Sequence, residues 1–324
     1  MTKPVAAVFA LLALAVLAML GARYKSDLVR AKRHAGGGII AQTAAGPIEY
    51  GQKGSGMALL SIHGAGGGFD QGLANIDGFA GAGFHIIAPS RFGYLRTPVP
   101  RDFSPAAQAD AHAALLAALN TPKAIVVGIS AGARSALELA LRHPERVSAL
   151  ILIVPGTYSP DSPVRVDQSR GSKFVFWLVN IGADFVWWAA EKISPSTLIR
   201  FVGVRPELVA AAPRPEQDRI KAIVESIEPL SARVRGIVID SNPDLHPLPL
   251  ERISAPTLII SAQDDLFNTA PAARFAAAAI PGARLKIFES GGHLLVGRQA
   301  EMRQILRDFL TRSHLLQPQS AGTQ

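Results

Sequence analysis

Ser130 is the residue whose surroundings point most directly to chemistry. It stands at the centre of Gly128-Ile129-Ser130-Ala131-Gly132, between an apolar run and a stretch with helical periodicity. A sharp turn from strand to helix exposes a serine hydroxyl, and the positions two before and two after it must be small because larger side chains would collide with nearby backbone. Gly128 and Gly132 meet this need. The pattern predicts a nucleophile, although Gly-x-Ser-x-Gly alone is also found in turns without chemistry.

Two later segments offer partners for such a serine. The apolar run 257–261 is followed by Asp264 and Asp265, and the next run leads into a Gly-Gly-His sequence that ends at His293. A histidine that takes the serine proton needs a carboxylate to fix its tautomer and stabilise its cation. We predict Asp264 and His293 for these roles. Asp265 is the alternative acid and otherwise caps the following turn.

A glycine-rich segment, His63-Gly64-Ala65-Gly66-Gly67-Gly68, follows an earlier apolar run. Small residues let the backbone approach a substrate oxygen, so the amides of Ala65 and Ala131 are predicted to form an oxyanion hole. The segment lacks the Lys-Ser/Thr of a phosphate-binding loop and the spacing of a dinucleotide-binding one. His63 is predicted to be structural rather than a base.

Apolar runs alternate with helical patterns through most of the chain after residue 39. This rhythm predicts a mostly parallel sheet covered by helices on both faces, with the chemical residues at strand ends. The expected strands are 58–62, 85–89, 124–128, 149–154, 257–261 and 285–288, and the expected helices are 69–80, 105–119, 131–142, 271–279 and 300–311.

The segment 157–254 breaks the rhythm, with helical patterns and few good strands. All three tryptophans, Trp177, Trp187 and Trp188, lie in its aromatic-rich part, 173–192. We predict a mainly helical cap whose aromatic part is either a packed helix or a lid that lines an acyl or aryl pocket or touches a bilayer. Asp240 lies inside this cap and is only a third choice for the catalytic acid.

The N-terminal run 5–22 carries no charge and as a helix would be about 27 Å long, close to the thickness of a bilayer core. We predict an uncleaved single-pass membrane anchor. A cleavable signal peptide, which would leave a secreted or periplasmic protein, is the alternative. Basic residues follow the run and favour a catalytic domain on the cytoplasmic side. Residues 23–38 are predicted to be a basic, glycine-rich stalk, and 313–324 a flexible tail.

Composition sets limits on the function. The 324 residues are 48% hydrophobic and 18% charged, which excludes disorder as the main state. The absence of cysteine excludes disulfides, thiol nucleophiles and cysteine-ligated metals. The net charge is +8, but residues 1–34 hold six basic residues against one acidic residue, so the remainder is nearly balanced. Neither a nucleic-acid partner nor a metal or other cofactor is expected, and the oligomeric state stays open.

Together these motifs resemble the α/β-hydrolase superfamily. The resemblance covers about 40–312 and implies the α/β-hydrolase fold, with a core of 39–156 and 255–312 and a cap between them. It also implies a Ser-Asp-His triad of Ser130, Asp264 and His293. The segment 88–94 is similar to the family's Asp-x-Arg-Gly loop, but Ser90 and Phe92 depart from it.

The resemblance is specific for fold and triad, and it leaves the substrate open. Hydrolysis of an ester of an apolar acyl substrate is the leading interpretation. Hydrolysis of a carbon–carbon bond, as in meta-cleavage-product hydrolases, is the alternative, and a haloperoxidase-like activity would use the same triad. Dehalogenases and epoxide hydrolases need an aspartate where this chain has Ser130. A non-catalytic binding protein on the same fold is the alternative from another class.

Overall fold

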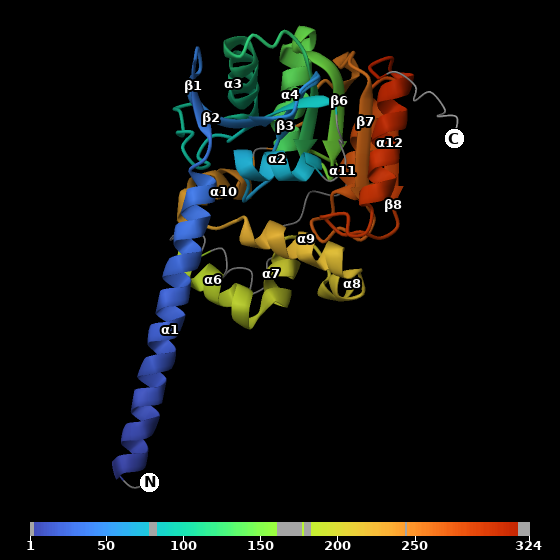
Figure 1. Cartoon of the computed structure of the whole chain (residues 1–324). Helices are drawn as coiled ribbons and strands as arrows, with labels where there is room; N and C mark the ends of the chain where they lie inside the picture. Colours follow the sequence, from blue (N-terminus) through green and yellow to red (C-terminus); the bar gives the residue numbers. More distant parts are fainter. Residues whose placement is uncertain (1–2, 78–82, 161–176, 178–182, 244, 317–324) are drawn as a thin grey trace, which may run out of the picture.

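A single eight-stranded sheet forms the centre of the molecule (Figure 1). The computed structural model describes residues 3–77, 83–160, 177, 183–243 and 245–316. The strand order is β1-β2-β4-β3-β5-β6-β7-β8; the pairs β1–β2 and β2–β4 are antiparallel and the others parallel. The strands are β1 (Ile39–Thr43), β2 (Gly46–Lys53), β3 (Met57–Ile62), β4 (Phe84–Pro89), β5 (Ala124–Ile129), β6 (Val147–Ile153), β7 (Thr257–Ala262) and β8 (Arg284–Phe288).

Helices cover both faces of this sheet because the strand side chains alternate between two apolar cores. Leu60 and Val126 point into the core shared with α3, α4 and α11, whereas Leu59 and Val127 point into the core shared with α2 and α12. These helices are α2 (Phe69–Asp77), α3 (Pro105–Ala118), α4 (Gly132–Arg142), α11 (Ala270–Ala279) and α12 (Gln299–Arg312).

All six predicted strands are present, the five predicted core helices begin within a few residues of their expected starts, and the last four also end within a few residues of their expected limits. The predicted end of the first helix, at residue 80, lies outside the described residues. The sequence prediction missed the β1–β2 hairpin, because polar residues and, in β2, two glycines interrupt the apolar residues of these strands. Its turn carries Gly46 at φ +94°, a backbone conformation that favours glycine.

A helical cap lies over the carboxyl ends of the strands (Figure 1). Trp187, Leu198, Ile227 and Ile237 from the cap form an apolar cluster with Tyr94 of the core. The cap contains α6 (Asp184–Ile193), α7 (Pro195–Phe201), α8 (Pro206–Ala210), α9 (Arg214–Glu225) and α10 (Val234–Ser241). Three short 3-10 turns are also described: η1 (Pro144–Arg146) lies between α4 and β6 of the core, η2 (Leu230–Ala232) precedes α10, and η3 (Leu250–Arg252) precedes β7.

The N-terminal helix α1 (Lys3–Ala35) extends away from the rest of the molecule (Figure 1). Its C-terminal half packs on α6, where Trp188 donates a hydrogen bond to Asp27 at 2.9 Å and stands edge-on to Tyr24. Helix α1 therefore continues past residue 22, the expected end of the anchor, and the expected stalk is helical through Ala35. The chain has no proline between these residues that would end the helix.

Among the described residues, no helix is both long enough and apolar enough to cross a membrane, so the predicted anchor over 5–22 is not confirmed. Most of the predicted tail, 317–324, lies outside the described residues.

Candidate active site

Ser130 sits on a tight turn between β5 and α4. Its φ of +52° is in the left-handed region that non-glycine residues rarely adopt, and its amide donates to the Ile153 carbonyl at 2.9 Å. A Cβ on Gly128 would lie 2.5 Å from the Ala136 Cβ, and one on Gly132 would lie 2.5 Å from the His63 carbonyl oxygen. Both flanking positions must therefore be glycine, as the sequence pattern predicts.

The structure brings His293 against this serine. The His293 Nε2 lies 2.9 Å from the Ser130 Oγ, although the two residues are 163 positions apart in the chain. The other ring nitrogen, Nδ1, lies 2.8 Å from Oδ2 of Asp265. Asp265 has a buried carboxylate that also accepts from the Phe267 amide at 2.8 Å and from the Thr269 hydroxyl. Hydroxyl, imidazole and carboxylate thus form one continuous chain.

The prediction of Asp264 as the partner of His293 is wrong. The chain turns immediately after β7, so two adjacent aspartates point in different directions, and Asp265, the alternative acid, faces the imidazole. Asp264 instead accepts hydrogen bonds from the amides of Gly291 and Gly292, at 2.9 and 2.7 Å, and contacts Arg205 of the cap at 3.1 Å.

Asp264 therefore fixes the loop that carries His293. Burial opposes its charge, but the Gly292 amide, Arg205, the Ser290 hydroxyl and the Gly291 amide outweigh burial and lower the pKa of Asp264 below its usual value. The carboxylate stays ionised at neutral pH and keeps the backbone before His293 in place. The spacing in the sequence could not show which aspartate faces His293, because the direction of each side chain is set by the geometry of the turn after β7.

The two amides predicted for an oxyanion hole, those of Ala65 and Ala131, both belong to residues that line the cavity in front of Ser130. Within the described part of the chain, neither amide donates to another protein group. Ala131 also stands at the N-terminus of α4, where the helix dipole favours negative charge. Both amides are thus available to a substrate oxygen.

The loop that carries Ala65 is held by a cap residue that the sequence analysis missed. Arg233 is fully buried, donates to the Gly67 carbonyl at 2.5 Å and pairs with Asp70, its Nη2 lying 2.6 Å from the Asp70 Oδ2. In the sequence Arg233 is one arginine among many in the cap, without a motif around it.

A second buried cluster joins cap and core at the segment 88–94. The guanidinium of Arg91 binds both carboxylate oxygens of Asp240, at 3.0 and 2.5 Å, and the Tyr94 hydroxyl donates to the same carboxylate at 2.5 Å. Asp240 is therefore a structural partner of this loop. His63 is structural as predicted: its Nε2 accepts from the Arg91 amide at 3.0 Å and its Nδ1 donates to the Gly64 carbonyl at 2.7 Å.

A cavity of about 870 Å³ opens at Ser130 between core and cap. Apolar side chains dominate its wall, and Trp187 and Phe201 are the cap aromatics among them. The aromatic cap segment thus contributes one tryptophan to the wall and one, Trp188, to the contact with α1. Phe174 and Phe176 lie outside the described residues.

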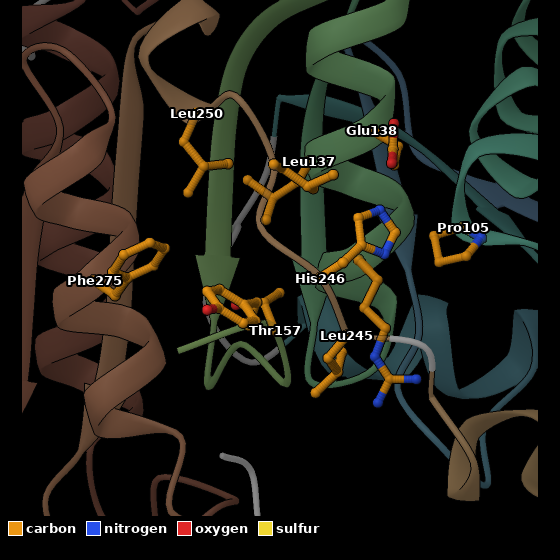
Figure 2. Close-up of a pocket in the computed structure, with 11 residues that line it drawn as sticks. Pro105, Leu137, Glu138, Thr157, Leu245, His246, Leu250 and Phe275 are labelled. Carbon is orange, nitrogen blue, oxygen red and sulfur yellow. The ribbon is translucent and has the colours of Figure 1, made fainter. Parts of the chain in front are cut away.

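A smaller cavity of about 30 Å³ lies beside α4 and holds no part of the triad (Figure 2). Leu137 and Glu138 of α4 face Phe275 of α11 and His246 of the segment before η3. Within the described ranges, no group of three or more histidine or carboxylate side chains is placed to hold a metal ion.

Comparisons with known proteins agree with this geometry. The sequence model of the alpha/beta hydrolase fold family matches residues 58–297. The chain belongs to this family. It is 28% identical to the 2-hydroxy-6-oxo-6-phenylhexa-2,4-dienoate hydrolase of Comamonas testosteroni over 276 residues, which are 81% of this chain and 91% of that protein.

Two solved structures extend the comparison. An alpha/beta hydrolase fold protein from Nakamurella multipartita has a TM-score of 0.68 at 27% identity, and the match covers 86% of this chain and 99% of that one. A membrane phospholipase A has a TM-score of 0.66 at 22% identity, and the match covers 98% of this chain and 100% of the phospholipase chain. The second likeness is one of fold alone.

Proposed function

We propose that this protein is a serine hydrolase that cleaves a carboxylic ester of a largely apolar acyl substrate. The observation that carries the proposal is the unbroken chain from the Ser130 hydroxyl through His293 to Asp265. Such a chain makes a serine nucleophilic at neutral pH, because the imidazole accepts the hydroxyl proton and the carboxylate stabilises the cation that forms. The apolar cavity beside Ser130 suits an acyl chain.

The reaction has two halves. His293 Nε2 takes the proton as the Ser130 Oγ attacks the ester carbonyl, and the Ala65 and Ala131 amides stabilise the oxyanion. The imidazolium then gives its proton to the departing alcohol and leaves an acyl-enzyme. Water, deprotonated by His293, attacks the acyl group, and collapse of the second tetrahedral species releases the acid and restores the serine.

Nitrophenyl esters of increasing chain length test this proposal, with Ser130→Ala as the matched control. We expect turnover by the native protein and a loss of about 10⁴-fold or more in the variant, whose thermal unfolding should be unchanged. A fluorophosphonate probe should label the native protein at Ser130 and leave the variant unlabelled. Full esterase activity in Ser130→Ala would reject the assignment.

Hydrolysis of a carbon–carbon bond is the second candidate, favoured by the Comamonas testosteroni relative. The triad would act in the same way on a ketone whose leaving group is a stabilised carbanion. Turnover of 2-hydroxy-6-oxo-6-phenylhexa-2,4-dienoate with a kcat/KM well above that of every ester would favour this reaction. A folded protein with neither turnover nor probe labelling would instead be a binding protein.

A further inference from the structure

Arg134 is a charged side chain in the wall of the Ser130 cavity that the triad does not use. It lies four positions after Ser130 on α4, and 14% of its side chain is exposed. Its Nε donates to the Gly156 carbonyl at 2.9 Å, and its Nη1 lies 3.6 Å from Oδ1 of Asp240. Within the described residues its other N–H groups have no acceptor at hydrogen-bond distance. A guanidinium has five donors, so Arg134 is only partly satisfied.

Within the wall of the Ser130 cavity, the charges around Arg134 do not balance. Asp240 is the only acidic residue among the described residues of the cavity wall, and both its oxygens already bind Arg91. The other groups of the cluster are neutral at physiological pH: burial lowers the pKa of His63 well below its usual value and raises the pKa of Tyr94 well above it. Two guanidinium groups therefore share one carboxylate, which leaves a net positive charge.

The other two arginines among the described residues of the wall differ from Arg134. Arg219 makes two hydrogen bonds to Glu216, at 2.9 and 2.7 Å, and a third to the Leu294 carbonyl. Arg200 is half-exposed to solvent and lies 3.9 Å from Glu207. Arg134 is thus the mostly buried cation of the described wall whose charge lacks an anion of its own. Burying an unbalanced charge is costly, and an anionic ligand would remove that cost.

We propose that Arg134 forms an anion subsite, so that the preferred ester carries a carboxylate or phosphate group close to the carbonyl that Ser130 attacks. This inference rests on the proposed esterase function. The planar guanidinium presents paired donors that match either anion. Asp240 and the Gly156 carbonyl hold the Arg134 side chain in place, while the apolar part of the cavity receives the remaining carbon chain.

Two matched series of substrates test the subsite. One contains mono-4-nitrophenyl esters of succinic to suberic acid, and the other contains 4-nitrophenyl alkanoates of equal chain length. At the best length we expect kcat/KM for the acid-bearing ester to exceed that of its neutral match by about tenfold or more, as for a charge-assisted hydrogen bond. A third series that ends in phosphonate tells which of the two anions is preferred.

Variants assign the preference to a residue. Arg134→Gln should bring the ratio of the two kcat/KM values to within about twofold of unity, and Arg134→Lys should restore part of it, as expected of a charge-assisted contact. Arg200→Gln, at the half-exposed arginine of the cavity wall, should keep the native ratio of the two kcat/KM values. Because Arg134 also contacts Gly156 and Asp240, a wild-type measurement that needs no variant is added: hexanoate should inhibit hydrolysis of a neutral ester competitively and more strongly than hexanamide.

The outcomes separate the two proposals. Turnover of neutral esters with no advantage for the acid-bearing series, and equal inhibition by hexanoate and hexanamide, would overturn the anion subsite and leave the esterase function standing. An advantage that survives in Arg134→Gln would show that the anion binds elsewhere and would overturn the assignment of Arg134. No turnover of any ester and no probe labelling would reject the esterase function itself.

Discussion

The core and the cap handle buried charge in different ways. In the core, His293 and Asp265 are aligned towards Ser130 beside a cavity, so their charges can serve a reaction. In the cap, Arg233 is fully enclosed and pairs with Asp70 beneath the glycine-rich loop. The core charges are arranged for chemistry, whereas this cap charge fixes the position of a core loop. Substitutions in the two regions should therefore affect different measured quantities.

The largest expected effect separates the adjacent aspartates of the core. Asp265→Asn should lower kcat on a nitrophenyl ester by about 10³- to 10⁴-fold, because an amide no longer stabilises the imidazolium or fixes the His293 tautomer. Asp264→Asn should cost about tenfold, since it weakens the bonds to the Gly291 and Gly292 amides without touching the ring. Steady-state kinetics of both variants show which substitution lowers kcat more. A larger loss for Asp264→Asn would contradict the assignment of Asp265 as the partner of His293.

In the cap, the expected effect is on stability. Arg233→Met leaves Asp70 buried without its partner and should lower the free energy of unfolding by about 3–5 kcal/mol, measured by urea denaturation. Arg214→Met removes an exposed ion pair with Asp218 and serves as the control, with an expected change below about 0.5 kcal/mol. Equal changes in the two variants would show that the buried pair does not fasten the cap to the core.

The smallest effect concerns two carboxyl groups of the cap, Glu191 and Glu228. Burial, and next the charge of Glu191, raise the pKa of Glu228 to about 8, and burial raises the pKa of Glu191 to about 7. The folded state therefore binds protons that the unfolded chain releases above about pH 4.5. The stability that this provides is present below that pH and is lost as pH rises through 7 to 8.

Glu228→Gln removes the part of this pH-dependent loss of stability that comes from Glu228, because a glutamine side chain does not titrate. We expect its melting temperature to exceed that of the native protein by a few degrees at pH 8, with a smaller difference at pH 5. Thermal melts from pH 5 to pH 9 give the slope of melting temperature against pH for the native protein and for Glu228→Gln. Glu251→Gln, at an exposed carboxyl, serves as the control. If the melting temperature of Glu228→Gln fell with pH as steeply as that of the native protein, this would contradict a raised pKa for Glu228.

The core architecture and two of the three triad residues, Ser130 and His293, could be predicted from the residues and their spacing. Apolar runs as short as 58–62, 124–128 and 257–261 favour central strands over buried helices, and the glycines around Ser130 are imposed by contacts closer than a Cβ allows. The apolar runs and the glycine spacing can be recognised in the sequence alone, although the contact that excludes a Cβ at Gly132 comes from the distant His63 carbonyl. His293 was predictable because it follows a strand in a glycine-rich loop.

The folded structure was needed to show which carboxylate faces His293, which cap residues hold the core, and how the charges in the cavity wall balance. Asp264 and Asp265 have almost the same sequence context, and a single turn separates their directions. Arg233, Arg134 and Asp240 meet partners 22 to 166 positions away. Such contacts follow from how the cap docks on the sheet, and the docking depends on packing distributed over many residues, without any local pattern in the sequence.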